Sequence, residues 1–152
     1  MAADHGPGVR VPPPILVGLL VGTGWMLQRA APVPVSTPAP NLAALLMALG
    51  MALSVWTVVT MLRAGVDPRP DRPDKALLER GPFRFSRNPI YLGFAITYAG
   101  LAIAMDSVLA LLLLIPCLLV VDRFVIQREE RYLAAKFGAD YEAYRARVRR
   151  WL

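Results

Sequence analysis

The sequence predicts an all-α, polytopic membrane protein with about four transmembrane helices, in a single domain of residues 1–152. Three observations support this prediction. The chain has 152 residues, a length typical of one domain. Its hydrophobic fraction is 56% and its charged fraction only 18%, which is too apolar for an ordinary soluble domain. Uncharged runs of helical length also alternate with strongly basic segments.

The intervals between charged residues locate the predicted spans. The longest has the roughly 20 residues that a bilayer requires. Asp106 separates the last two spans in a tight turn, where Asp106 or Ser107 is the N-cap of the following helix, so these spans form a C-terminal helical hairpin. In the first span, Gly18 and Gly22 have a spacing that is typical of close helix packing but also arises by chance. The spans are predicted at residues 15–27, 41–62, 89–105 and 107–121.

Basic residues gather in the loop after the second span and in the tail from residue 122, whereas the loop after the first span holds only Arg29. Cytoplasmic loops carry an excess of Lys and Arg, so both basic segments and the N-terminus are predicted to face the cytoplasm. The predicted localisation is therefore an integral membrane protein with both termini cytoplasmic. Because apolar spans divide the net charge of +6, no nucleic-acid partner is expected, and no metal site is predicted.

The tail has an amphipathic pattern. Its apolar and aromatic residues recur at steps of three and four, which predicts one face of a C-terminal helix, interrupted near Gly138. Such a helix either lies in the headgroup zone of the membrane or covers a site at the cytoplasmic ends of the spans. The residues of this face are Leu133, Phe137, Tyr141, Tyr144, Val148 and Trp151.

Three motifs on the predicted cytoplasmic side carry a family resemblance. They read GPFRFSRNPIYLG from Gly81, QREERYLAAKFG from Gln127 and ADYEAYRARVRRWL from Ala139, with the helical hairpin between the first and the second. In this order they resemble the isoprenylcysteine carboxyl methyltransferase and phospholipid methyltransferase superfamily. The resemblance implies an integral-membrane methyltransferase that uses S-adenosyl-L-methionine. It covers roughly the C-terminal 90 residues, while the first two spans match only as generic helices.

The resemblance implies a cofactor region at about residues 75–93 and 122–144. Many relatives carry histidine where Asn88 lies, and Asn88 can cap its helix or hydrogen-bond the cofactor but cannot shuttle a proton at neutral pH. No catalytic residue is assigned, because nothing decides between the available bases. The cofactor-binding residues implied by the resemblance are Leu77, Leu78, Phe83, Arg87, Asn88, Pro89, Ile90, Tyr91, Glu129 and Glu130.

Two neighbouring acids and one arginine have distinct expected roles. Glu129 and Glu130 lie about 100° apart on a helix, so both cannot face one pocket equally. The resemblance favours Glu129 as the ligand of the cofactor's ribose hydroxyls or ammonium group. Glu130 is then expected to pair with Arg84, Arg87 or Arg131. Arg87 is expected to bind the cofactor carboxylate, an anionic acceptor or a lipid phosphate.

The expected function is methyl transfer to a lipophilic or amphipathic acceptor at the boundary between membrane and cytosol. An isoprenylcysteine-type carboxylate and a phospholipid-type amine both fit this description. The alternative is a non-catalytic membrane protein that binds anionic lipid or a partner through its basic cytosolic loop. Membrane lipids and a lipid or small-molecule substrate are the expected partners.

Overall fold

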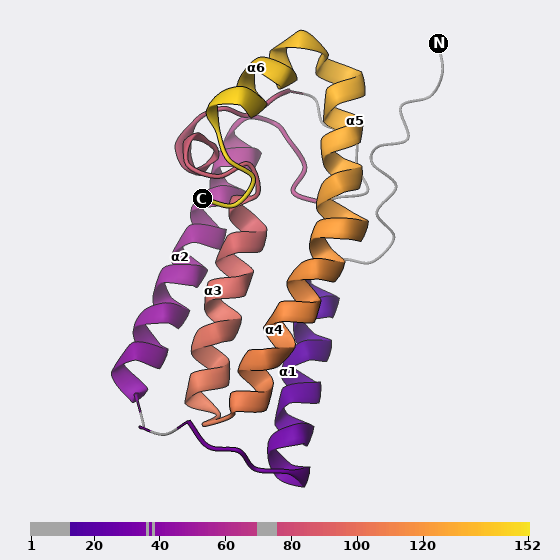
Figure 1. Ribbon diagram of the computed structural model, residues 1–152. Helices are drawn as coiled ribbons and strands as arrows, with labels where there is room; N and C mark the ends of the chain where they lie inside the picture. Colours follow the sequence, from indigo (N-terminus) through magenta and orange to yellow (C-terminus); the bar gives the residue numbers. More distant parts are fainter. Residues whose placement is uncertain (1–12, 36, 38, 70–75) are drawn as a thin grey trace.

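The apolar runs of the sequence form four helices that lie side by side as a bundle; the fourth continues beyond the bundle into α5, and the short helix α6 lies across that end (Figure 1). The computed structural model describes residues 13–35, 37, 39–69 and 76–152. Every regular element in these ranges is helical. In chain order the elements are α1 (Pro13–Ala30), α2 (Pro40–Arg63), the 3₁₀ turn η1 (Gly81–Arg84), α3 (Pro89–Ala104), α4 (Val108–Val121), the π-helical segment η2 (Asp122–Ile126), α5 (Gln127–Phe137) and α6 (Ala139–Arg147).

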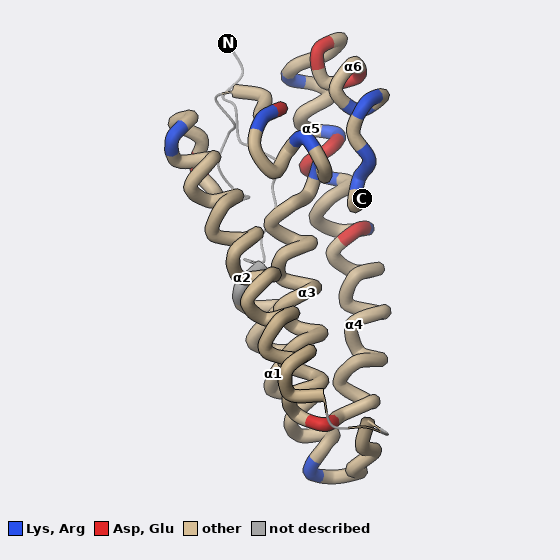
Figure 2. Tube along the Cα trace, turned by 90° about the vertical axis from the view of Figure 1, so that its left-hand side faces the viewer, with Lys and Arg blue, Asp and Glu red and all other residues tan. Residues whose placement is uncertain are grey.

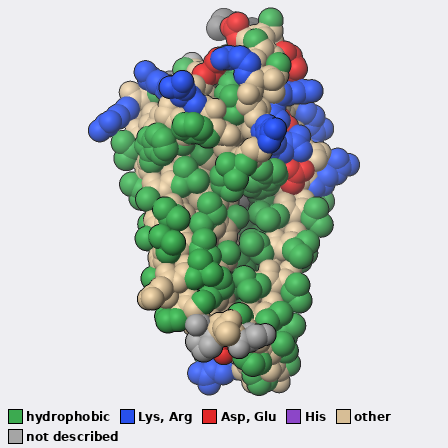
Figure 3. Space-filling model, turned by 60° about the vertical axis from the view of Figure 1, so that its left-hand side comes forward, with side chains coloured by type: hydrophobic (Ala, Val, Ile, Leu, Met, Phe, Trp, Pro, Cys, Tyr) green, Lys and Arg blue, Asp and Glu red, His purple; other side chains and the backbone are tan. Residues whose placement is uncertain are grey.

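Two stretches of the bundle are long and apolar enough to cross a membrane. They are Pro40–Arg63, with 24 residues, and the continuous helix Val108–Phe137, with 30 residues. Ile15–Ala30 and Pro89–Ala104 are also apolar helices but are shorter, so the prediction of four spans is supported for two of them. The bundle surface is largely apolar, while charged residues of the described chain gather at the end that carries α5 and α6 (Figures 2 and 3).

Small residues bring α2 and α3 into close contact. A Cβ atom added to Gly93 would lie 2.3 Å from the Ser54 Oγ and 2.8 Å from the Gly50 carbonyl oxygen. One added to Gly100 would lie 2.7 Å from the carbonyl oxygen of Ala43. Close backbone approach through small residues is the usual way in which apolar helices pack in membranes. This contact fixes the position of α3, whose first turn carries residues of the site.

The first-span glycines do not have the packing role that their spacing suggested. A Cβ atom at Gly18 or Gly22 would meet nothing within 4 Å. The close approach in α1 occurs instead at Gly24, where a Cβ atom would lie 3.0 Å from the Ala110 Cβ on α4. The spacing therefore marks no close contact within the described chain, because a four-residue interval does not say which helix face meets a neighbour.

The turn between α3 and α4 confirms the predicted helical hairpin. Ser107 is the N-cap of α4, and its hydroxyl accepts a hydrogen bond from the Ala110 N–H. Asp106 has a positive φ of 51°, as a tight turn requires. Its carboxylate accepts a hydrogen bond of 2.8 Å from the Val35 N–H, so Asp106 also ties the first loop to the hairpin.

The fourth apolar helix ends at Val121, as the predicted span does, but the backbone continues as one helical rod into the tail. The helix continues from α4 through η2 into α5, because no glycine or proline follows Pro116 before Gly138. Only the polarity of the side chains changes at Asp122. Gly138, with a φ of 53°, then ends α5 and turns the chain into α6, which lies across the end of the bundle (Figure 1). The tail therefore covers the ends of the helices.

The contact between α2 and α3 predicts that Gly50→Ala lowers the stability of the bundle. The new Cβ atom would lie 2.5 Å from the Thr97 backbone nitrogen and 2.6 Å from the Gly93 carbonyl oxygen, neither of which can rotate away. We expect a loss of about 2 kcal/mol, typical of an overpacked core, seen as a lower melting temperature of the detergent-purified protein. Gly22→Ala is the matched control and should leave the melting temperature equal or slightly higher. Equal melting temperatures of the two variants would contradict the close contact assigned to Gly50.

Candidate functional site

The segment from Gly81 to Asn88 is held between α2 and the C-terminal tail. Gly81 has a positive φ of 60° and lies against α2, where an added Cβ atom would be 3.1 Å from the Thr60 Oγ1. Pro82 is buried in η1, and Pro89 occupies the first turn of α3, where its missing N–H costs least. The two prolines and the glycine therefore give this basic loop a fixed path onto the start of α3.

The residues that follow α6 pair with this loop and form a C-terminal strap, which we define as residues 148–151. The Arg87 N–H donates to the Arg149 carbonyl oxygen at 3.0 Å. The Asn88 side-chain amide donates to the Arg150 carbonyl oxygen at 3.1 Å. Asn88 occupies the N-cap position of α3, but its side chain makes no capping hydrogen bond. Its side chain holds the strap instead.

The tail is also anchored by aromatic residues. The Tyr144 hydroxyl donates to the Phe83 carbonyl oxygen at 2.8 Å. Burial, as the largest cause, raises the pKa of Tyr144, so this hydroxyl remains a donor at physiological pH. Trp151 packs against the buried cluster at the junction of α3 and the long rod, which contains Tyr91, Val121, Val125 and Ile126.

A network of ion pairs lies beneath the strap. The guanidinium of Arg150 contacts the Glu130 carboxylate at 2.6 Å and the Asp122 carboxylate at 3.2 Å. Glu130 also accepts from Arg87 Nη2 at 3.1 Å, and the side chains of Arg87 and Glu130 are only 10% and 13% exposed. The hydrogen bond with Glu130 is the largest cause that raises the pKa of Arg150. Of the three arginines predicted to pair with Glu130, the structure selects Arg87, and it adds Arg150.

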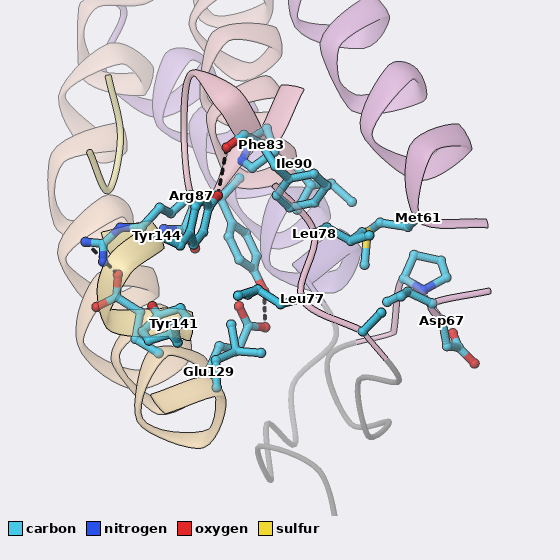
Figure 4. Close-up of a pocket in the computed structure, with 18 of the residues that line it drawn as sticks. Met61, Asp67, Leu77, Leu78, Phe83, Arg87, Ile90, Glu129, Tyr141 and Tyr144 are labelled. Atoms are coloured by element: carbon cyan, nitrogen blue, oxygen red, sulfur yellow. Dashed lines mark hydrogen bonds and ion pairs between the residues drawn. The ribbon is translucent and has the colours of Figure 1, made fainter. Parts of the chain in front are cut away.

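All ten predicted cofactor residues line one cavity above α3, beneath α5 and α6 (Figure 4). Its polar side carries Arg87, Glu129 and the tyrosines of α6, and its apolar side carries Leu78, Phe83 and Ile90. The Tyr91 hydroxyl donates to a Glu129 carboxylate oxygen at 2.7 Å and orients it in the wall. The cavity therefore combines a charged, hydrogen-bonding half with an apolar, aromatic half.

Some polar atoms of the cavity wall have no partner within the described part of the chain. They are Nε and Nη1 of Arg87 and the hydroxyl of Tyr141, all buried. Burial raises the pKa of Tyr141 to about 12, with the nearby Glu130 charge as the next cause, so the hydroxyl keeps its proton at neutral pH. Buried donors without acceptors are costly, and a cluster of them in a cavity indicates a ligand with acceptor atoms.

The cavity contains further residues that the sequence did not assign to it. Leu133, Tyr141 and Tyr144 belong to the motifs that carried the family resemblance, so a signal for them was present. Asp67 and Arg69 follow α2 and pair with each other at 2.6 Å, and no motif marks them. The unassigned lining residues are Met61, Val66, Asp67, Pro68, Arg69, Ala76, Leu133, Tyr141 and Tyr144.

Comparison with known proteins identifies the family of this chain. A family model described as phospholipid methyltransferase matches residues 39–140. The chain belongs to the phospholipid methyltransferase family. The match contains all ten predicted cofactor residues and confirms the resemblance drawn from the motifs. An uncharacterized protein of Haemophilus influenzae is 40% identical over 63 residues, which are 41% of this chain and the whole of that protein.

Family membership implies methyltransferase activity on a lipid-type acceptor, and the apolar helices suit a membrane-associated enzyme. Within the described ranges, no group of three or more His, Cys, Asp or Glu residues could hold a metal ion. The described lining of the cavity offers hydrogen-bond donors, carboxylates and aromatic walls.

The ion network predicts that Arg150→Gln destabilises the tail. The change leaves the carboxylates of Asp122 and Glu130 without their shared partner, and we expect a loss of about 2 kcal/mol, since Arg150 is partly exposed. Thermal unfolding in detergent at neutral pH measures the effect. Arg149→Gln is the control, because Arg149 contributes its backbone carbonyl to Arg87 and its side chain is exposed. A melting temperature that falls equally in both variants would show that net charge, not the network, is responsible.

Proposed function

We propose that this protein transfers a methyl group from S-adenosyl-L-methionine to a lipophilic or amphipathic acceptor at the boundary between membrane and cytosol. The observation that carries the proposal is the cavity beneath α6, where buried donors without partners lie beside an oriented carboxylate. The acceptor classes that fit are an isoprenylcysteine-type carboxylate and a phospholipid-type amine.

The lining residues suit each part of this cofactor. The free Nε and Nη1 of Arg87 and the Tyr141 hydroxyl are donors for its carboxylate. Glu129, held by Tyr91, is an acceptor for its ammonium group or ribose hydroxyls. The apolar half of the cavity suits a planar adenine. The predicted residues from Leu77 to Glu130 would therefore hold the cofactor, although Asn88 would do so mainly by positioning the strap.

S-adenosyl-L-methionine supplies an electrophilic methyl group on a sulfonium. The contribution of the chain is to position the acceptor and exclude water, with α5, α6 and the strap as the cover. A carboxylate acceptor is already nucleophilic as the anion, whereas an amine must lose a proton. Tyr91 and Glu129 form the hydrogen-bonded pair in the wall where such a proton could be received.

The placement of the site supports the proposed membrane orientation. The loop before α3 and the tail meet at one end of the bundle, so the two basic segments share one side. We place this side in the cytosol, with α1 and α3 crossing the membrane beside the two longer helices. The termini then face the cytosol; the first twelve residues lie outside the described ranges.

Cofactor binding gives the first test. Isothermal titration of the detergent-purified protein should detect S-adenosyl-L-methionine, and Arg87→Gln should weaken binding about tenfold or more because a charge-assisted contact is lost. Glu129→Gln should weaken it similarly. Arg84→Gln is the control, since Arg84 is exposed and does not line the cavity, and its affinity should match that of the unaltered protein. Unchanged affinity in both cavity variants would remove these residues from the site.

Methyl transfer gives the second test. Protein in lipid nanodiscs, supplied with methyl-labelled donor, should label an acceptor from a panel of isoprenylcysteine-type acids and phospholipid amines, and Glu129→Gln should lower the rate by at least tenfold. The rate is measured by counting labelled lipid extract. Cofactor binding without any labelled product would exclude the acceptors of the panel. An absence of both would favour the alternative, a non-catalytic membrane protein.

A further inference from the structure

A second concave site lies beside the cavity described above, and Glu130 lines both of them. Its lining is strongly cationic, with five arginines and one acid among nine residues. Glu130 already contacts Arg87 and Arg150, so it does not neutralise the rest of this lining. We name this site the basic cleft. Its lining residues are Arg123, Phe124, Gln127, Arg128, Glu130, Arg131, Ala134, Arg145 and Arg150.

Two of the five guanidinium groups of the basic cleft are paired with carboxylates, because Arg150 contacts Glu130 and Asp122 and Arg145 contacts Glu142, whereas the other three have no such pair in the described part of the chain. Arg128 and Arg131 have no carboxylate within 4 Å in the described part of the chain, and both are exposed. Within the described ranges, Arg131 donates to the Gln127 carbonyl oxygen and Arg123 to the Gln127 side chain. Guanidinium groups that converge on one hollow match the geometry of a phosphate.

The position of the basic cleft indicates the source of that phosphate. Arg123 and Phe124 follow Val121, the last residue of the apolar helix α4, so the cleft opens where the rod changes from apolar to charged. Phe124 is 56% exposed. Together with exposed apolar side chains of α4, spaced three to five residues apart, it forms an apolar strip along the helix. These side chains are Leu112, Ile115 and Leu119. A small free anion would make no contact with this apolar strip, whereas an acyl chain would pack against it.

We propose that the basic cleft binds the phosphate of an anionic phospholipid, whose acyl chains lie along the exposed face of α4. The headgroup phosphate sits among Arg123, Arg128 and Arg131, at the level where the bilayer surface meets the rod. The cleft and the cavity use different residues of α5 and share Glu130, so the proposed lipid site is separate from the proposed cofactor site. The proposal does not depend on methyl transfer.

Native mass spectrometry of the full chain in detergent tests the proposal, with dioleoyl phosphatidylglycerol and dioleoyl phosphatidylcholine as probes. We expect preferential retention of the anionic lipid. Arg128→Gln combined with Arg131→Gln should weaken it by at least tenfold, since each arginine near a lipid surface contributes severalfold in affinity. Arg63→Gln combined with Arg84→Gln is the control, because it removes the same charge from exposed positions outside the cleft. This control should retain the lipid within about twofold.

Three outcomes would overturn the proposal. Equal loss in both double variants would show a general charge effect, and equal retention of the two lipids would show no preference for an anionic headgroup. Displacement of the lipid by inorganic phosphate or by glycerol phosphate at equal concentration would show that acyl chains play no part. Circular dichroism and the melting temperature check that the variants are folded. A single Arg128→Lys variant, which keeps the charge but not the planar guanidinium, should lose affinity only partly.

Discussion

The bidentate contact of Arg150 with Glu130 and Asp122 is the interaction on which the cytosolic end of the molecule depends. It joins the strap to two residues that lie about two turns apart on the long rod. Glu130 in turn fixes Arg87 in the cavity wall. Removal of one member of a partly buried network leaves charges without compensation, which costs more than the pair contributes. The strap, the rod and the start of α3 therefore hold one another in place, and the cavity lies among them.

The helix bundle supplies the rigid base for this arrangement. The glycine contact between α2 and α3 determines how far the first turn of α3 rises above the apolar core. Tyr91, on that turn, is buried against Val125 and Ile126 while its hydroxyl reaches Glu129. One side chain thus links apolar packing within the bundle to the orientation of a carboxylate in the cavity. The π-helical segment, which inserts an extra residue in the helical repeat, sets which rod residues face this junction.

The ten residues named from the sequence line one cavity because most of them lie in one short segment of the chain. The motif from Gly81 to Tyr91 is one continuous path, and Glu129 follows a hairpin whose turn is marked by Asp106 and Ser107. Contacts that depend on tertiary geometry were missed. Arg150 meets Glu130 only because α6 reverses the chain after Gly138, and no periodicity encodes that path. The helical continuity of rod and tail was not predicted either, since polarity changes at Asp122 while the backbone stays helical.

The charges of the cavity also bear on what it can hold. Its described lining has three carboxylates and two guanidinium groups, so charges of both signs face the same space. Arg87 also directs unpartnered donors into it. An anion alone would meet the donors but would face the carboxylates, and a cation alone would leave the donors unsatisfied. A group that carries charges of both signs satisfies both conditions. Under the function proposed above, the amino-acid part of S-adenosyl-L-methionine would be such a group, with its carboxylate at Arg87 and its ammonium near Glu129.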